Sequence, residues 1–390
     1  MYVMVLYAIL VCFLLGIVLS GKKNTRRLEM VISGIVFLII LMDFSLGPDY
    51  GTYYNIYERV SNPIREMLMY HSSRNIGFTT LAFLCKLITP SYAFFVFVCN
   101  FISVSLCAYV IYKYSDSILF STLLFVGSGI FVIYYGSGIR QMIAMSLFFY
   151  AFYSFIPKKK YLLYEIVILI ACTFHEASVI GLFIPLVAMC VPMIEKKRNT
   201  FAIGGTIICV LIGFFIIRFM PKVASFFENG YSAIFHIFSY FTRASQISIM
   251  GLGMEVVFIL VIILLEYLAD NLKVDPIISL EITICFLMFF LYLVFMRYPI
   301  ISRICDFYQI IFLIMIPRLW NTIEDKGKKL FGLCVVVLLN GFLLYSDVNY
   351  TIALLNNSYG YSFTFYSYPY TNIFNSGQIS EYMRVLTDGK

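Results

Sequence analysis

Long apolar runs alternate along the chain with short connections that carry charge, proline or glycine. Most of these runs are close to the roughly 20 residues that one membrane-spanning helix needs. The pattern predicts twelve spanning helices, near residues 2–20, 30–46, 91–112, 118–135, 138–156, 161–176, 177–192, 200–219, 251–269, 277–296, 303–317 and 330–346. The shorter run 76–90 ends at Pro90, so we expect a half-helix there, or the kinked start of the third span.

The composition agrees with this pattern. Hydrophobic residues make up 61% of the 390 residues and charged residues only 13%, which excludes soluble enzymes and nucleic-acid binders. The predicted fold class is an all-α polytopic membrane protein of about twelve transmembrane helices with extra half-helices and an outer-face cavity, in one integral membrane domain over residues 1–390. We interpret residues 1–20 as a retained helix, because no basic region or cleavage site accompanies the apolar run.

Basic residues predict which ends of the helices face the cytoplasm. If the loop 21–29 is cytoplasmic, the basic loops 158–160, 196–198 and 318–329 lie on the same side. That side then carries 12 Lys and 4 Arg, whereas the outer side carries 3 Lys and 9 Arg. Guanidinium groups match phosphate oxygens in a bidentate manner, so the outer arginines indicate a phosphate-bearing ligand. The alternative is that they pair with nearby acids or reach lipid headgroups.

Three outer segments are long enough to contribute to a site: 47–75, 220–250 and the tail 347–390. The first contains Tyr50 and Tyr53, the second contains Arg243, and the tail contains Tyr370. Tyrosine rings with hydroxyl tips suit the apolar faces and polar rims of sugars. Aromatic belts at membrane interfaces produce the same composition, so ligand contact and interface anchoring both remain open.

A glycine-containing turn leads into a helix that begins with Arg140 and Gln141 at the predicted outer face. Free backbone N–H groups at a helix N-terminus attract anions, and a cation in the first turn strengthens this attraction. The sequence therefore predicts a phosphate contact at Arg140. The alternative is a simple ion pair of Arg140 with Asp49 or Glu58.

His175 lies at a predicted outer hairpin between two apolar runs. Ionisable residues near membrane depth are costly and therefore functional candidates, and an imidazole can exchange protons near neutral pH. A hydrogen-bonded core histidine is the alternative. Arg297 and Arg303 flank another short outer loop and could converge on one anion, although Asp306 is placed to pair with Arg303.

These residues resemble the EpsG/Wzy group of bacterial surface-polysaccharide polymerases. The matching segments, in order, are Gly47-Pro48-Asp49-Tyr50 with Tyr53, Gly138-Ile139-Arg140-Gln141, Phe174-His175-Glu176-Ala177-Ser178, the late Arg297 and Arg303, and Pro369-Tyr370. Such proteins often carry Glu before Gly-Phe at the start of the third helical segment. Here Asn75-Ile76 precedes Gly77-Phe78, so no carboxylate role transfers to that place.

The resemblance implies a polymerase that joins undecaprenyl-pyrophosphate-linked oligosaccharide repeat units at the outer face of the cytoplasmic membrane, giving O-antigen, capsule or exopolysaccharide. The lipid-linked oligosaccharide is then both donor and acceptor, and the lipid bilayer is the surrounding partner. A chain-length regulator and a flippase are further candidate partners, and no nucleic acid is expected. The donor's sugar–phosphate bond supplies the free energy, so we expect no cofactor and no metal.

Within that reaction each candidate residue has an expected role. The outer arginines hold the pyrophosphate and stabilise the charge that grows on it: Arg140, Arg297, Arg303 and Arg243. His175 or Asp49 takes the proton from the acceptor hydroxyl. The sugars are positioned by Gln141, Tyr50, Tyr53 and Tyr370.

Other activities fit part of the same pattern. A glycosyltransferase that uses a polyprenyl-phosphate sugar, or an O-antigen ligase, would share the outer site. A transporter of lipid-linked oligosaccharide would line its path with charge through the midplane, whereas the ionisable residues here gather near one face. A protein with only an interaction role would leave the Arg/Lys asymmetry unexplained.

Overall fold

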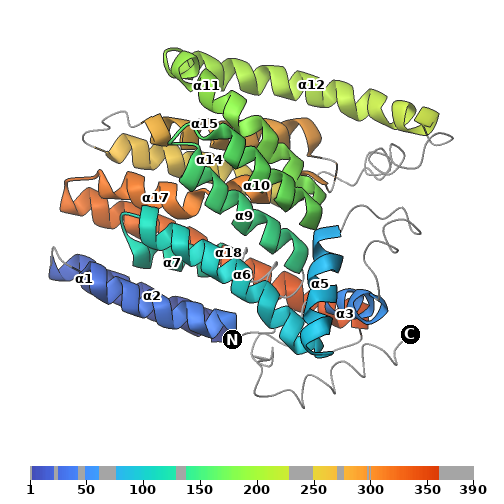
Figure 1. Ribbon diagram of the computed structural model, residues 1–390. Coiled ribbons are helices and arrows are strands. Elements are labelled where there is room, and N and C mark those ends of the chain that lie inside the picture. Colours follow the sequence, from blue (N-terminus) through green and yellow to red (C-terminus); the bar gives the residue numbers. More distant parts are fainter. Residues whose placement is uncertain are drawn as a thin grey trace.

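The computed structural model describes residues 2–21, 25–42, 49–60, 76–128, 138–227, 249–269, 276–296, 298 and 300–359 (Figure 1). Over these residues the chain is helical and forms no strand. The elements are α1 (Tyr2–Ser20), α2 (Arg26–Leu41), α3 (Tyr50–Arg59), α5 (Ile76–Ile88), α6 (Tyr92–Tyr114), α7 (Ile118–Gly127), α9 (Ile139–Phe155), α10 (Tyr161–Phe174), the 3-10 helix η2 (Glu176–Phe183), α11 (Ile184–Glu195), α12 (Arg198–Phe227), α14 (Ile249–Leu268), α15 (Pro276–Phe295), α16 (Ile300–Gln309), α17 (Phe312–Asn321) and α18 (Lys326–Tyr359).

Several helices have the length and apolar composition of membrane spans. Among the described residues there are five: Val3–Ser20, Tyr92–Tyr114, Glu176–Glu195, Pro276–Phe295 and Lys326–Asn357. Four further helices are apolar but shorter: Ile76–Ile88, Ile118–Gly127, Tyr161–Phe174 and Thr200–Phe215. The all-helical polytopic fold class is therefore confirmed. The count of twelve spans and the outer-face cavity stay predictions.

Two of the predicted spans have a different internal structure. Residues 303–317 were expected as one span, but α16 ends at Gln309 and α17 begins at Phe312. Residues 177–192 begin with the 3-10 helix η2 before α11 starts. Hydropathy averaged over a run does not distinguish one continuous helix from two short ones. The half-helix expected at 76–90 is confirmed as α5.

All three of the predicted outer segments contain helix, since α12 continues past the predicted end at 219 to Phe227 and so enters the segment 220–250. The segment 47–75 includes α3, in which Tyr53 and Tyr57 are four residues apart and both are buried. Side chains at this spacing lie on one helix face, so packing favours a helix where the glycine and proline indicated only a turn. The predicted tail 347–390 begins as helix, because α18 continues to Tyr359 with Val348 and Ile352 buried at helical spacing.

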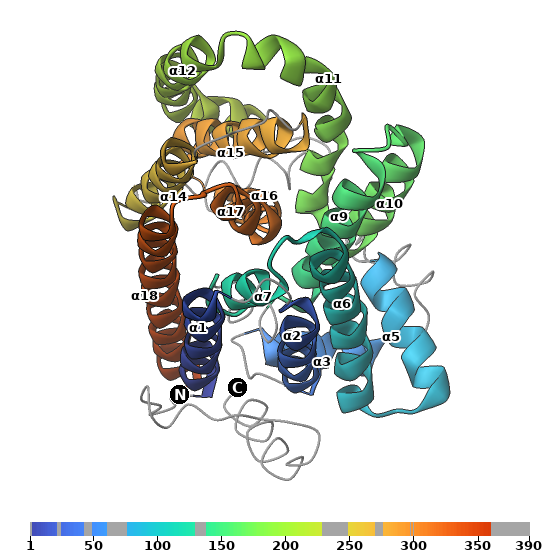
Figure 2. The ribbon, with the colours of Figure 1, turned by 90° about the vertical axis from the view of Figure 1, so that its left-hand side faces the viewer.

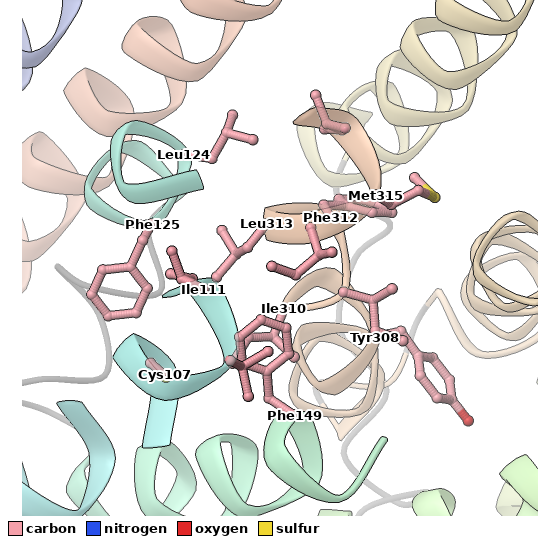
Figure 3. Close-up of a cluster of buried hydrophobic side chains, with 14 of the residues drawn as sticks. Cys107, Ile111, Leu124, Phe125, Phe149, Tyr308, Ile310, Phe312, Leu313 and Met315 are labelled. Carbon is pink, nitrogen blue, oxygen red and sulfur yellow. The ribbon is translucent and has the colours of Figure 1, made fainter. Parts of the chain in front are cut away.

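The divided helix lies at the centre of the molecule. Figure 2 shows α16 and α17 surrounded by α14, α15, α9, α7 and α18. The turn between the two helices, Ile310–Ile311, is fully buried. Figure 3 shows this turn packed among side chains of α6, α7 and α9, including Cys107, Phe125 and Phe149. Burial of the connection holds both short helices in the core.

The helix ends that are predicted to face the cytoplasm contact one another. Glu29 of α2 accepts hydrogen bonds from the Ser117 hydroxyl and the Leu119 backbone N–H, both at 3.2 Å, and so places its carboxylate at the N-terminus of α7. The Ser279 hydroxyl donates to Glu195 at 3.1 Å. These contacts agree with the predicted grouping of the loops, since every partner belongs to the same predicted side.

A buried ion pair fastens this end of the bundle. Arg318 Nη1 of α17 lies 2.8 Å from Glu281 Oε1 of α15, and Glu281 is fully buried. The Tyr153 hydroxyl of α9 donates to the same oxygen at 2.6 Å, and Arg318 Nη2 donates to the Tyr114 carbonyl oxygen at 3.4 Å. Four helices therefore meet at one charged network. The network matters for stability because removing Arg318 would leave the Glu281 carboxylate buried without a cation, which is strongly unfavourable.

We expect Arg318→Met to lower the free energy of unfolding by about 3–5 kcal/mol, because Glu281 would be left as a buried charge without its cation. Thermal unfolding of the detergent-solubilised protein measures this loss. The matched control is Glu195→Gln, whose carboxylate is exposed and should matter by less than about 1 kcal/mol. Equal unfolding temperatures for Arg318→Met and the control would contradict the assignment.

Candidate functional site

An aromatic cluster holds α3 against α5 and α6 at the predicted outer end (Figure 1). The Tyr53 ring lies 5.4 Å from the Phe78 ring, and the Tyr57 ring stacks on Phe95 at 5.2 Å. Lys86 Nζ of α5 donates to the Glu58 carbonyl oxygen at 2.9 Å and so binds the C-terminal end of α3. These contacts fix the position of Tyr53, which is 4% exposed.

Arg140 meets this cluster from the first turn of α9. Its guanidinium carbon lies 5.3 Å from the centre of the Tyr53 ring, a cation–π geometry. Burial raises the pKa of Tyr53, and the charge of Arg140 acts in the opposite direction. Asp49 and Arg303 also act on Tyr53, more weakly. Three predicted site residues, Asp49, Arg140 and Arg303, therefore lie within electrostatic reach of Tyr53.

Gln141 joins the start of α9 to α16. Its Nε2 donates to the Arg303 carbonyl oxygen at 3.2 Å and to Asp306 Oδ2 at 3.4 Å. The side chain is 3% exposed. Because its side-chain amide donates to two groups of α16, Gln141 holds the start of α9 against α16. The predicted contact of Gln141 with sugar stays a prediction.

His175 occupies the one-residue connection between α10 and η2. Its Nδ1 accepts a hydrogen bond from the Ala177 backbone N–H at 3.3 Å and caps η2. Burial, followed by the charges of Arg140 and Arg303, lowers the pKa of His175 to about 3. The imidazole is therefore neutral at physiological pH. Since Nδ1 accepts, the single ring proton is on Nε2, which makes Nε2 a hydrogen-bond donor.

The two arginines converge on this imidazole from different helices. Arg140 comes from α9 and Arg303 from α16, and both act on the charge of His175. Arg303 is exposed and Arg140 is half-buried. The structure thus brings together six of the predicted site residues: Asp49, Tyr53, Arg140, Gln141, His175 and Arg303.

The remaining predicted site residues are not placed. Tyr50 begins α3, and its side chain is not described. Arg243, Arg297 and Tyr370 lie outside the described residues. The aromatic partners Phe78 and Phe95 are not predictable as site residues, because their positions in apolar runs give no signal beyond ordinary core packing.

The fold and the site together define a helical membrane protein with a basic and aromatic cluster at one end of its bundle. The chain belongs to the EpsG family, whose model matches residues 27–372. The matched range includes all the predicted site residues, and the resemblance inferred from short motifs is confirmed at the level of the family. Neither the curated proteins nor the solved structures that were compared include a match.

The lowered pKa of His175 predicts a pH-dependent stability. The unfolded chain, with a pKa of 6.5, binds a proton that the folded chain does not take up until about pH 3, so stability is lost as the pH falls below 6.5. Between pH 7 and pH 5 this loss should be about 2 kcal/mol.

Thermal unfolding of wild type and His175→Asn at the two pH values tests this effect. Asparagine can still cap η2 through its side-chain oxygen but does not titrate, so the variant should lose less stability on acidification. An equal loss in both proteins would show that His175 does not titrate as inferred.

Proposed function

We propose that the protein joins undecaprenyl-pyrophosphate-linked oligosaccharide repeat units into surface polysaccharide at the outer face of the cytoplasmic membrane. One observation carries this proposal: Gln141, which follows Arg140, donates to the Arg303 carbonyl oxygen at 3.2 Å and so brings the two arginine-bearing helices together beside the buried His175. Two cations on adjoining segments suit a diphosphate, which is the leaving group of such a donor. Membership of the EpsG family supports a polysaccharide polymerase.

In this mechanism Arg140 and Arg303 bind the pyrophosphate of the donor and stabilise the negative charge that develops as the glycosidic bond breaks. The Tyr53 ring orients the guanidinium of Arg140 from behind. Arg297 and Arg243 are proposed to complete the anion contacts, and Tyr50 and Tyr370 to contact sugars. The cations are fixed before the substrate arrives, which reduces reorganisation during the reaction.

His175 enters this mechanism as a hydrogen-bond donor. Its Nε2 carries the ring proton while Nδ1 accepts from Ala177. Such a neutral donor can bind a phosphate or sugar oxygen without adding charge. The sequence leaves the base role open between His175 and Asp49. For His175 to act as the base through Nε2, its ring proton would have to move to Nδ1, which accepts the hydrogen bond from Ala177. We therefore assign proton acceptance to a carboxylate.

We expect Arg140→Ala to reduce the polymerisation rate by about 100-fold or more, because one preorganised cation is lost from the transition state. Arg140→Lys should fail nearly as fully, since an ammonium group cannot form the bidentate contact. Polysaccharide chain length in cells and polymerisation by the purified protein measure the effect. Arg26→Ala is the matched control, because Arg26 is exposed at the opposite end and donates to the Tyr112 carbonyl oxygen.

The side of the membrane on which repeat units accumulate distinguishes polymerisation from transport. A polymerase defect in Arg140→Ala leaves single repeat units at the outer face. Accumulation at the cytoplasmic face would favour a transporter of the same lipid-linked oligosaccharide. Wild-type chain lengths in Arg140→Ala would remove the proposed role of the arginine.

A further inference from the structure

Asp306 lies where the two arginine-bearing segments meet. It follows Arg303 by three residues on α16, so both side chains lie on one helix face. Its Oδ2 accepts a hydrogen bond from Gln141 Nε2 at 3.4 Å, and Gln141 follows Arg140 directly. The Asp306 side chain is only partly buried, so solvent and ligands can reach this carboxylate.

A second carboxyl group backs Asp306 from α14. Glu255 is 5% exposed, and its Oε2 has no hydrogen-bond partner among the described residues. Its carboxyl group lies within electrostatic reach of Asp306. Cys285 and Tyr292 of α15 and Cys305 of α16 also interact with Glu255, and none of these three groups is a cation.

Burial and mutual repulsion together determine the charge of this pair. An ionised carboxylate buried without a cation is costly, and two neighbouring carboxylates cannot both ionise cheaply. Asp306 has an amide donor and access to solvent, whereas Glu255 is buried and its Oε2 has no hydrogen-bond partner among the described residues, so Asp306 is the better placed of the two to carry the negative charge. A pair with one proton can accept another from a substrate, as carboxyl dyads do.

We propose that Asp306, backed by Glu255, is the base that takes the proton from the acceptor sugar hydroxyl. This inference rests on the polymerase function proposed above. It assigns proton acceptance to neither of the groups first considered. His175 carries its proton on the nitrogen that remains available, and Asp49 is exposed at the start of α3.

The chemical step balances with the groups named. The acceptor O–H bond breaks, and its electron pair forms the new bond to the anomeric carbon of the donor. The bond from that carbon to the pyrophosphate oxygen breaks, and the electron pair leaves with the lipid pyrophosphate. The proton passes to Asp306 and later to water. Protonation removes a negative charge from beside the arginines as charge develops on the pyrophosphate, so more of their field acts on the leaving group.

Asp306→Asn tests the assignment, because the amide oxygen of asparagine can still accept from Gln141 while the basic carboxylate is lost. With purified protein and the strain's own lipid-linked repeat unit, we expect kcat to fall about 100-fold or more. Thermal stabilisation by undecaprenyl pyrophosphate should remain, since the arginines are intact. Asp306→Glu keeps a carboxylate and should recover part of kcat. Asp116→Asn, an exposed aspartate at the other end, is the matched control.

Glu255→Gln tests the second carboxyl group. Glutamine has the same shape but cannot exchange a proton, so the pair can no longer share one, and we expect kcat to fall while thermal stabilisation by undecaprenyl pyrophosphate remains. Wild-type kcat in Glu255→Gln would overturn the role of Glu255.

The outcomes separate this inference from the proposed function. Near-wild-type kcat in Asp306→Asn would overturn the base assignment, while a defective Arg140→Ala in the same assay would leave the polymerase proposal standing. If Arg140→Ala also keeps its activity and its stabilisation by undecaprenyl pyrophosphate, the proposed function itself fails. Loss of both kcat and stabilisation in Asp306→Asn would identify a structural residue and overturn its role as the base.

Discussion

The approach of Arg140 and Arg303 to one buried imidazole is the constraint around which the predicted outer end is organised. Two like charges that act on the same place require compensation from neighbouring groups. The face of the Tyr53 ring lies behind one guanidinium. Gln141 links the backbone and the carboxylate of α16 to the start of α9. These contacts offset part of the free-energy cost of bringing the cations together, and an anionic ligand would offset more of it.

The opposite end of the bundle uses charge for a different purpose. Glu281 and Arg318 neutralise each other at 2.8 Å, and Tyr153 completes the network from the same α9 that carries Arg140. Glu29 occupies the N-terminus of α7. Glu281, Arg318 and Glu29 each have a partner within the fold, so these charges hold helices together at this end.

Much of the architecture could be predicted from the sequence, because apolar runs of spanning length leave few alternatives to helices. The same signal failed at α3, where aromatic packing forms a helix in a segment with turn residues, and at the α16–α17 division, where the run gives no sign of the break between Gln309 and Phe312. The arginines and His175 could be chosen by chemistry alone. Their convergence depends on contacts between residues more than 160 positions apart, as in the Gln141–Arg303 bond, and no local pattern contains that information.

The division of the central helix also separates two mechanical units. At the turn, the Ile311 backbone N–H donates to the Tyr308 carbonyl oxygen and the Ile314 N–H to the Ile311 carbonyl oxygen, so the regular four-residue spacing is interrupted. α17 is anchored by Arg318, while α16 carries Arg303 and Asp306. A tilt of α16 about this turn would move Arg303 relative to Arg140 and His175, while α17 would stay in place.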